Sequence, residues 1–248
     1  MKARNFFKSA TELFKANWKV WVCLILVLFL IQVVPGIFLE VESKETFSFS
    51  LLIIEICLGL ISMALGLGLI SAGLKEVSAT KASINDLVSV FDRRLLTIIT
   101  VSIIMTAATM TVIGGSIMLG ILLADTISTA LLVLMSVTGL IMIVVAGAYL
   151  SIRLLFVQYI IVDANEGPIQ SLKKSWQLSK GNISLLVRFL SYAVAINFLG
   201  LLLFGVGLLY TMPITTIATA MLYLHLNGPQ HSKERLEFNN DLNSTTLN

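Results

Sequence analysis

Four polar residues inside the apolar runs of this chain are the first candidates for chemistry: Glu55, Thr106, Arg153 and Asn197. An ionisable group within a membrane-spanning helix is costly to keep there, so its presence suggests a role in transport or ligand binding. For Glu55 we favour a protonated or hydrogen-bonded carboxyl near the outer interface, because helical rise places it only about 10 Å inside its run. For Arg153 the alternatives are an ion pair with Asp163 and a contact with an acidic lipid headgroup.

Thr106 belongs to a stripe of small and polar residues on one helical face of its run. Such a stripe can line a pore, but small residues more often let two helices approach closely, and we favour close packing here. Asn197 is expected to form a hydrogen bond with a neighbouring helix. The stripe consists of Ser102, Thr106, Thr109, Ser116 and Gly120.

No group of residues predicts catalysis. The two histidines, His225 and His231, have no serine, cysteine or carboxylate partner at an informative spacing, and no glycine-rich phosphate loop follows a strand. Cys23 and Cys57 lie in apolar runs at different predicted depths, so we expect packed thiols rather than a disulfide or metal ligands. The sequence therefore predicts a protein that is not an enzyme and has no catalytic residues, no metal and no cofactor.

The composition indicates an integral membrane protein. Hydrophobic residues make up 57% of the 248 residues, charged residues only 12%, and the mean hydropathy is +0.93. Soluble domains carry about 25% charged residues, which they need to cover a surface that faces water.

Six apolar runs are long enough to cross a bilayer as helices, since one crossing takes about 20 residues and every backbone group must be paired internally. Short connections such as "EVESKETF" join them in pairs, so the predicted fold is an all-α membrane protein of three hairpins. Residues 1–227 form a single six-span domain on this interpretation, and the polar residues 228–248 form a disordered cytoplasmic tail. The runs cover residues 18–39, 48–73, 95–124, 129–152 or beyond, 183–204 and 208–227.

The basic residues predict the orientation. Every lysine and arginine except Lys44 falls on one side of these spans. Because cytoplasmic loops carry an excess of lysine and arginine, both termini are predicted to be cytoplasmic.

Each predicted hairpin follows a segment with the pattern of an amphipathic helix. In all three an apolar residue precedes an aromatic one by seven positions, and basic residues follow. This order predicts three repeated units, near residues 1–75, 76–160 and 161–227, each an interfacial helix followed by a hairpin; chance is the alternative, because any amphipathic helix shows such pairs. The pairs are Phe7 with Phe14, Ile84 with Phe91, and Ile169 with Trp176.

Local signals mark the second and third of these helices. Ser83 and Asp86 have the spacing of a capping box, with aspartate in the acidic position. Pro168 suits the first turn of the third helix, in which Ile169, Leu172 and Trp176 form the apolar stripe.

Basic and aromatic residues at the cytoplasmic ends of the runs are candidates for contact with lipid headgroups or with a partner. Both residue types are enriched where a protein meets the headgroup layer. The expected partners are anionic lipid headgroups on the cytoplasmic side, together with a protein partner or a second copy of the chain, but no nucleic acid. The candidates are Trp18, Arg93, Arg94, Tyr159, Lys173, Lys174, Trp176 and Lys180.

Residues 149–182, "YLSIRLLFVQYIIVDANEGPIQSLKKSWQLSKGN", carry a family resemblance. The block resembles the membrane domain found ahead of some bacterial glycerophosphodiester phosphodiesterases, and is similar to stand-alone inner-membrane proteins of unassigned role. The resemblance implies a polytopic helical fold in a bacterial cytoplasmic membrane. It implies no activity, because the membrane portion of that family offers no catalytic residues to place on this sequence.

Two functions are compatible with these observations. The leading hypothesis is a non-enzymatic scaffold or membrane-homeostasis protein whose interfacial helices bind lipids or a partner. The alternative is a transporter or channel for a small or lipidic substrate, with Glu55 and the polar stripe along its path. An intramembrane enzyme has no positive support.

Overall fold

The computed structural model describes residues 3–42, 49–78, 82–87, 93–123, 129–203 and 205–245, which form helices and turns and contain no strand. Some side chains at the outer ends of the long helices, and those after Gly228, lie outside the described set. The helices are α1 (Ala3–Ala16), α2 (Trp18–Glu42), α3 (Phe49–Val77), the 3₁₀ turn η1 (Ile84–Leu87), α4 (Arg93–Leu123), α5 (Thr129–Arg153), α6 (Val157–Ala164), α7 (Pro168–Ser179), α8 (Ile183–Leu202) and α9 (Leu208–Thr245).

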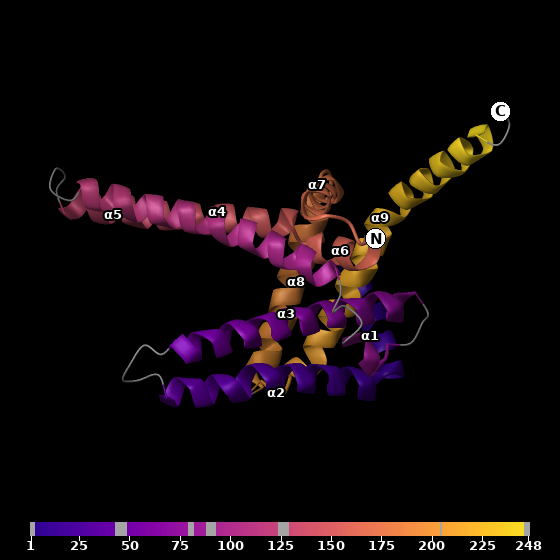
Figure 1. Cartoon of the computed structure of the whole chain (residues 1–248), viewed down its shortest axis with the longest axis horizontal. Helices are drawn as coiled ribbons and strands as arrows, with labels where there is room; N and C mark the ends of the chain where they lie inside the picture. The colour runs from indigo at the N-terminus through magenta and orange to yellow at the C-terminus, as the bar shows by residue number, and fades with distance from the viewer. Residues whose placement is uncertain are drawn as a thin grey trace.

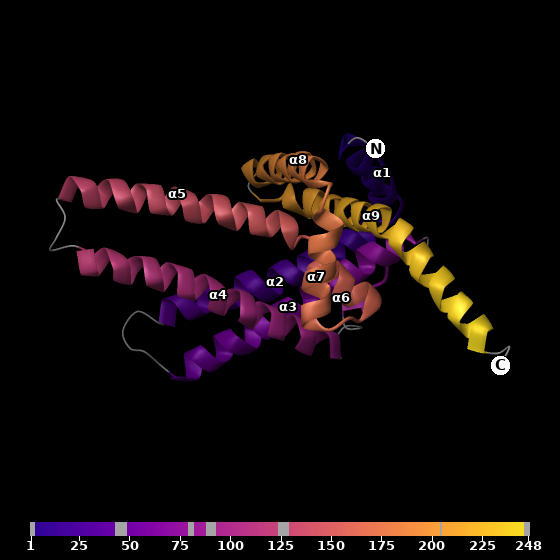
Figure 2. The same ribbon diagram turned by 90° about the horizontal axis from the view of Figure 1, so that it is seen from above.

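The longest helices form two side-by-side pairs and a transverse pair. The pair α2 and α3 and the pair α4 and α5 extend in the same direction, whereas α8 and the first half of α9 run across their base (Figures 1 and 2). The second half of α9 projects away from the other helices (Figure 1). The α9 helix continues to Thr245, over residues for which the sequence predicts a disordered tail from residue 228.

Four described segments are long and apolar enough to cross a membrane, and a fifth is added if α1 and the start of α2, bent by 95°, count as one broken span. The protein is therefore an all-helical protein with several membrane-compatible helices. Six spans in three hairpins are not confirmed. The four segments are Ile53–Val77, Arg94–Ser116, Val137–Ala164 and Ile183–Leu202.

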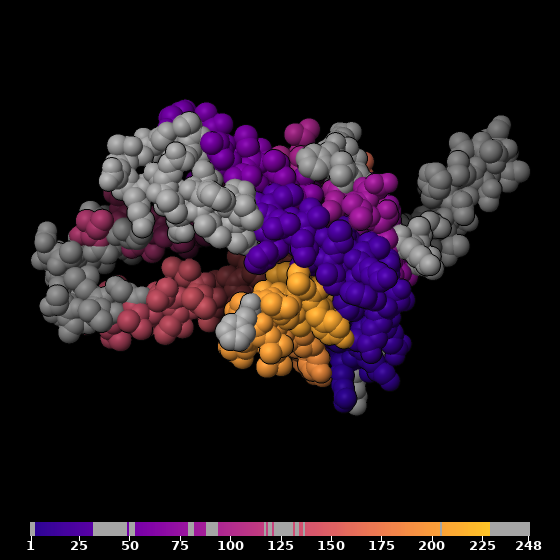
Figure 3. Space-filling view, turned by 90° about the horizontal axis from the view of Figure 1, so that it is seen from below, coloured from indigo at the N-terminus to yellow at the C-terminus, as the bar shows by residue number. Residues whose placement is uncertain are grey.

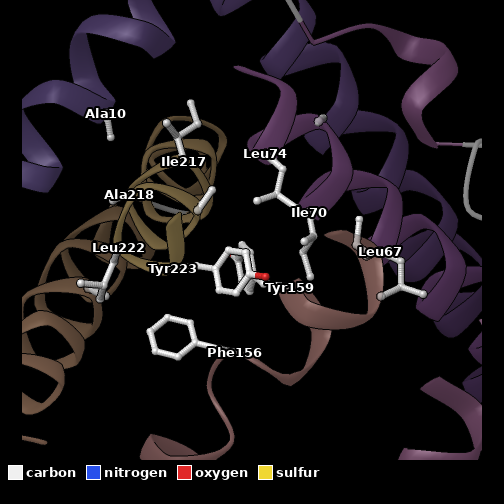
Figure 4. Packing of buried hydrophobic residues seen from close by; sticks show 14 of the residues in the cluster. Ala10, Leu67, Ile70, Leu74, Phe156, Tyr159, Ile217, Ala218, Leu222 and Tyr223 are labelled. Atoms are coloured by element: carbon white, nitrogen blue, oxygen red, sulfur yellow. The ribbon is translucent and has the colours of Figure 1, made fainter. Parts of the chain in front are cut away.

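The first half of α9 forms the centre of the core. Ile217, Ala218, Leu222 and Tyr223 are fully buried, which is unlike a helix that faces lipid. Threonines lower the hydropathy of this helix, and the hydroxyls of three of them, Thr215, Thr216 and Thr219, donate to backbone carbonyls one turn back. The residues around α9 in Figure 4 come from α1, α3, the α5–α6 turn and α6: Ala10, Leu67, Ile70, Leu74, Phe156 and Tyr159.

The bend between α1 and α2 is held at Asn17. Its side-chain amide donates to Oε2 of Glu76 at 3.3 Å and to the carbonyl of Ala82 at 3.2 Å. The backbone N–H of Ala82 donates to the same Glu76 oxygen at 3.0 Å. The buried Glu76 carboxylate thus ties the α1–α2 bend to the end of α3, and its hydrogen bonds offset its removal from water.

Of the second predicted amphipathic helix, the described residues include only the beginning, which forms the 3₁₀ turn η1. Asp86 accepts a hydrogen bond from the Ser83 N–H at 2.8 Å and pairs with Lys75 of α3, which closes a tight turn. Leu87 then packs on Gly68, where an added Cβ would lie 2.4 Å from the Leu87 Cα. Val88 and Phe91, the later members of the predicted stripe, lie outside the described residues.

Candidate functional site

The candidate site forms where α5 ends and the chain turns back on itself. The α5 helix stops at Arg153, and α6 begins at Val157 after a three-residue turn. The carbonyl of Arg153 accepts two hydrogen bonds from α7, from Oγ of Ser175 at 2.9 Å and from Oγ of Ser179 at 3.0 Å. The N–H of Phe156 donates to Ser175 Oγ at 3.3 Å. Because α7 satisfies these groups, the break in the helix leaves them paired although they are buried.

The face of α7 that meets this break is a stripe of serines. Ser171, Ser175 and Ser179 follow at spacings of four residues, and all three are fully buried. Ser171 closes the start of the helix by donating to the Gly167 carbonyl at 3.0 Å. Small hydroxyl side chains let α7 lie close to the turn, so hydrogen bonds as well as apolar contacts fix its position.

The opposite face of α7 points outward and carries the large side chains. Ile169 is 62% exposed and Trp176 is 41% exposed, and Lys173 and Lys180 on the same side are also exposed. The predicted apolar stripe is therefore reversed: of its three members, only Leu172 is partly buried against the core. The sequence signal for the true inner face was the regular spacing of Ser171, Ser175 and Ser179, which the search for apolar residues passed over.

Arg153 lies beneath this outward face, between two aromatic rings. Its Nε and Nη2 donate to the Tyr149 hydroxyl at 3.0 and 2.8 Å. Its Cζ lies 5.2 Å from the centroid of the Tyr149 ring and 4.7 Å from that of Trp176, within the range of cation–π attraction. The two rings meet edge to face. The residue is 9% exposed, and its Nη1 is buried without a hydrogen-bond partner.

No carboxylate pairs with Arg153 among the described residues. The sequence left open an ion pair with Asp163, but Asp163 instead accepts a hydrogen bond from the Tyr223 hydroxyl at 2.8 Å. The nearby Glu166 is paired with Lys174 at 2.8 Å. Among the described residues, the Arg153 guanidinium therefore contacts one hydroxyl and two aromatic faces but no carboxylate.

A cavity of about 390 Å³ lies between α4 and the α5–α7 segment. Its lining is mostly apolar, with Met105 and Leu150 among its walls, and it includes Ser102 and Thr109 of the predicted polar stripe. Thr106 is exposed and does not line it. Two members of the stripe therefore face a cavity, although the stripe as a whole does not.

The intramembrane candidates do not converge on one site. Glu55 and Thr106 are exposed on α3 and α4, and neither they nor Arg153 line the cavity. Asn197 of α8 donates to Thr215 Oγ1 of α9 at 3.1 Å, which is the bond to a neighbouring helix that the sequence predicts.

The structure places Tyr159, one of the predicted headgroup contacts, in the core. Its side chain is 6% exposed and packs on Tyr223, with ring centroids 5.9 Å apart, and its hydroxyl donates to the Thr216 carbonyl at 3.4 Å. A tyrosine beside a basic segment suggests an interfacial ring, but here the central helix α9 covers it. Tyr159 is therefore a core residue.

The other headgroup candidates vary in exposure. Trp18 is 51% exposed at the start of α2, with the Lys19 ammonium 6.0 Å from its ring centroid. Arg94 is half-buried, and Arg93 begins α4 with a side chain outside the described set. Cys23 and Cys57 differ from the expectation of packed thiols, because both are exposed free cysteines.

Comparisons of the chain with protein-family models, with curated proteins and with solved structures find no match. The resemblance of residues 149–182 to the membrane domain of bacterial glycerophosphodiester phosphodiesterases therefore remains a prediction.

Proposed function

We propose that this protein is a non-enzymatic membrane protein whose helix α7 binds anionic lipid headgroups at the cytoplasmic surface, in a scaffold or membrane-homeostasis role. The observation that carries the proposal is the outward face of α7. Ile169 and Trp176 are exposed there beside Lys173 and Lys180, while the inner face of the same helix is occupied with hydrogen bonds to α5.

The physical chemistry of this face suits the boundary between hydrocarbon and water. An amphipathic helix in that layer gains from burying apolar side chains in the acyl boundary and from placing lysines near anionic headgroups. Each basic residue near an anionic surface contributes about 1 kcal/mol. Tryptophan prefers the headgroup level because its ring is apolar and its N–H is polar.

The attachment of α7 to α5 supports the depth that this function requires. At 1.5 Å per residue, the 25 residues of α5 measure about 37 Å, somewhat more than the hydrocarbon thickness of about 30 Å. The end of α5 at Arg153 therefore falls near the headgroups when the helix crosses the bilayer. A helix bonded to that end lies in the same layer.

The finer topology that fits the proposal is the one the sequence predicts. It has six crossings, both termini on the cytoplasmic side of a bacterial inner membrane, and α7 on that same side, as the distribution of lysine and arginine favours. This layout requires α8 and α9 to align with the two hairpins in a bilayer. Labelling of single cysteines from each side of sealed vesicles tests it, with residues of the 205–207 turn expected to react from outside.

The experiment for lipid binding uses the full chain in vesicles of phosphatidylcholine, alone or mixed with phosphatidylglycerol. The substitution Trp18→Phe removes one of the two other tryptophans, and the second, Trp21, is fully buried. In this background, lipids brominated near the headgroup therefore quench mainly Trp176. We expect quenching to increase with the anionic lipid and to decrease in the double variant Lys173→Gln/Lys180→Gln.

The matched control removes two exposed lysines from α1, in the variant Lys8→Gln/Lys15→Gln. This control is expected to quench like the parent, because α1 turns its aromatic face to protein. Equal quenching of parent and α7 variant in both vesicle types would contradict the proposal.

The cavity between α4 and α5 favours the second candidate function, movement of a small or lipidic substrate. Its apolar walls and the hydroxyls of Ser102 and Thr109 suit an amphipathic molecule. Filling it with Thr109→Phe is expected to stop flux of such a substrate through proteoliposomes. Unchanged flux in Thr109→Phe, with Thr106→Phe as the control outside the cavity, would contradict this alternative.

A further inference from the structure

We propose that Arg153 is a specific binding residue for the phosphate group of an anionic phospholipid, with its Nη1 as the donor and Trp176 as a cover over it. The inference rests on the proposed function and goes further than it, because it names one ligand group and one residue. The lysines of α7 supply a general attraction to an anionic surface, whereas Arg153 supplies a single defined contact.

The first observation is the unsatisfied donor. Three of the five guanidinium N–H groups belong to Nε and Nη2, which share the Tyr149 hydroxyl, and the two on Nη1 meet no acceptor. Buried polar groups in folded proteins are paired in the great majority of cases, so an unpaired one indicates an absent partner. An arginine that is 91% buried is a strong instance, because a buried cation also lacks the solvation that water would give it.

The second observation is the lack of any protein anion that could serve as the partner. The carboxylates near Arg153 in the chain are both engaged: Asp163 with Tyr223 and Glu166 with Lys174. The part of the chain that the structure describes therefore contains no competing ion pair for Arg153. The missing partner is expected to be an anion from outside the chain.

Phosphate is the anion that fits best. The planar guanidinium matches phosphate and carboxylate oxygens, and its attachment to Tyr149 and contact with two rings fix its plane in advance. Lys173 and Lys180 are exposed on the outward face above it, which favours an anionic group approaching from that side. The exposed Ile169 beside them favours a ligand with acyl chains over free phosphate.

Trp176 explains how the site stays covered and how it opens. Its ring lies 4.7 Å from the Arg153 Cζ and is 41% exposed. The neighbouring Ser175 holds the α7 backbone to the Arg153 carbonyl, so rotation of the Trp176 side chain uncovers Nη1 while the helix remains in place. In a bilayer, the headgroup layer attracts the indole ring and so favours the open rotamer.

The site is separate from the cavity between α4 and α5. Gly147, Ser151 and Leu154 line that cavity, and helical spacing places Tyr149 and Arg153 on the other side of α5. The headgroup contact and the cavity can therefore be tested independently.

The test uses the full chain in neutral detergent micelles with the Trp18→Phe background. Short-chain phosphatidylglycerol is titrated while Trp176 fluorescence is followed, and inorganic phosphate is titrated in a separate experiment. We expect a saturable change with the lipid at a concentration where inorganic phosphate gives none. In Arg153→Gln the affinity is expected to fall at least about tenfold, the equivalent of about 1.4 kcal/mol for a charge-assisted hydrogen bond.

One further variant, Arg153→Lys, separates the effect of charge from that of the planar guanidinium. Arg153→Lys retains the charge but not the planar fork, so it is expected to bind more weakly than the parent and more tightly than Arg153→Gln. Unfolding temperatures in lipid-free micelles show whether Arg153→Lys or Arg153→Gln has lost its structure. If Arg153→Lys is folded and binds like the parent, charge alone suffices and the specific contact is refuted.

The remaining outcomes separate the two proposals. If the lysine variant of α7 loses its vesicle response while Arg153→Gln binds lipid like the parent, α7 is interfacial and the Arg153 site is refuted. If inorganic phosphate saturates the protein as tightly as the lipid does, the site binds free phosphate and the lipid assignment is overturned. If Arg153→Gln loses binding in micelles but vesicle quenching never depends on anionic lipid, the site stands and the interfacial role fails.

Discussion

Helices α1 and α7 share an amphipathic sequence pattern but turn opposite faces towards the rest of the protein. In α1 the aromatic stripe faces protein: Phe7 packs on Phe189 with ring centroids 4.9 Å apart, and Phe14 packs on Tyr210 at 5.0 Å. Figure 3 shows α1 and the start of α2 lying against the segment around α9. In α7 the aromatic face points outward, and three serines form the inner face.

This difference shows what an amphipathic pattern determines and what it leaves open. The pattern fixes which side chains share a face, since helical spacing is geometry. Which face meets protein depends on the surface available. The α1 helix lies beside α8 and α9, which present Phe189, Tyr192 and Tyr210, whereas α7 lies beside a broken helix end whose backbone groups need hydrogen bonds.

The largest effect is expected for Phe7→Ala in α1. Phe7 is 4% exposed and contacts two rings, so the truncation should lower the free energy of unfolding by about 4 kcal/mol. Equilibrium unfolding in mixed micelles measures this change. Trp18→Ala is the control, because that ring is half-exposed, and a similar loss in both variants would show that α1 is not anchored by its aromatic face.

Ser175→Leu is the matching change on the inner face of α7. The site has no exposed surface, and the substitution removes two hydrogen bonds while adding volume, so we expect a loss of about 3 kcal/mol. Gln177→Leu adds the same side chain at an exposed position and should leave stability nearly unchanged. If the two variants unfolded alike, the serines would not be the face that anchors α7.

Trp176→Ala should cost far less than Phe7→Ala although both remove an aromatic ring. Its ring is 41% exposed and contributes mainly the cation–π contact with Arg153, so we expect a loss of about 1 kcal/mol. Trp176→Phe keeps a ring and should recover part of it. A loss equal to that of Phe7→Ala would mean that the two faces are not different in kind.

The smallest effects distinguish the two adjacent lysines of α7. Lys173→Gln should change stability by less than about 0.5 kcal/mol because its side chain is exposed. Lys174→Gln removes the pair with Glu166 and should cost up to about 1 kcal/mol. A double-mutant cycle with Glu166→Gln measures the coupling free energy of the pair. A coupling near zero would show that the ion pair of Lys174 adds no more to stability than the exposed Lys173 does.

The sequence predicted the helices well because their causes are local. Apolar runs too long for a strand gave α2 to α5 and α8, and Pro168 marked the first residue of α7. A local pattern suffices for these features because each depends on neighbours a few residues away.

The site was predicted less well because its contacts join distant segments. Tyr159 is buried by Tyr223 of α9, and no spacing in the sequence links these two residues. The inner face of α7 was missed because serines at helical spacing satisfy a carbonyl on another helix, which apolar periodicity does not report. Arg153 was recognised as unusual from its type alone, but its unpaired nitrogen is visible only in three dimensions.

The contact between α1 and α9 also bears on how the chain is made. Because α1 is synthesised before α9, Phe14 has no Tyr210 to pack on until the start of α9 has emerged from the ribosome. A contact between residues far apart in the sequence is slow to form because a long loop must close first. During synthesis, the aromatic face of α1 therefore lacks its ring partners until α8 and the start of α9 have followed it.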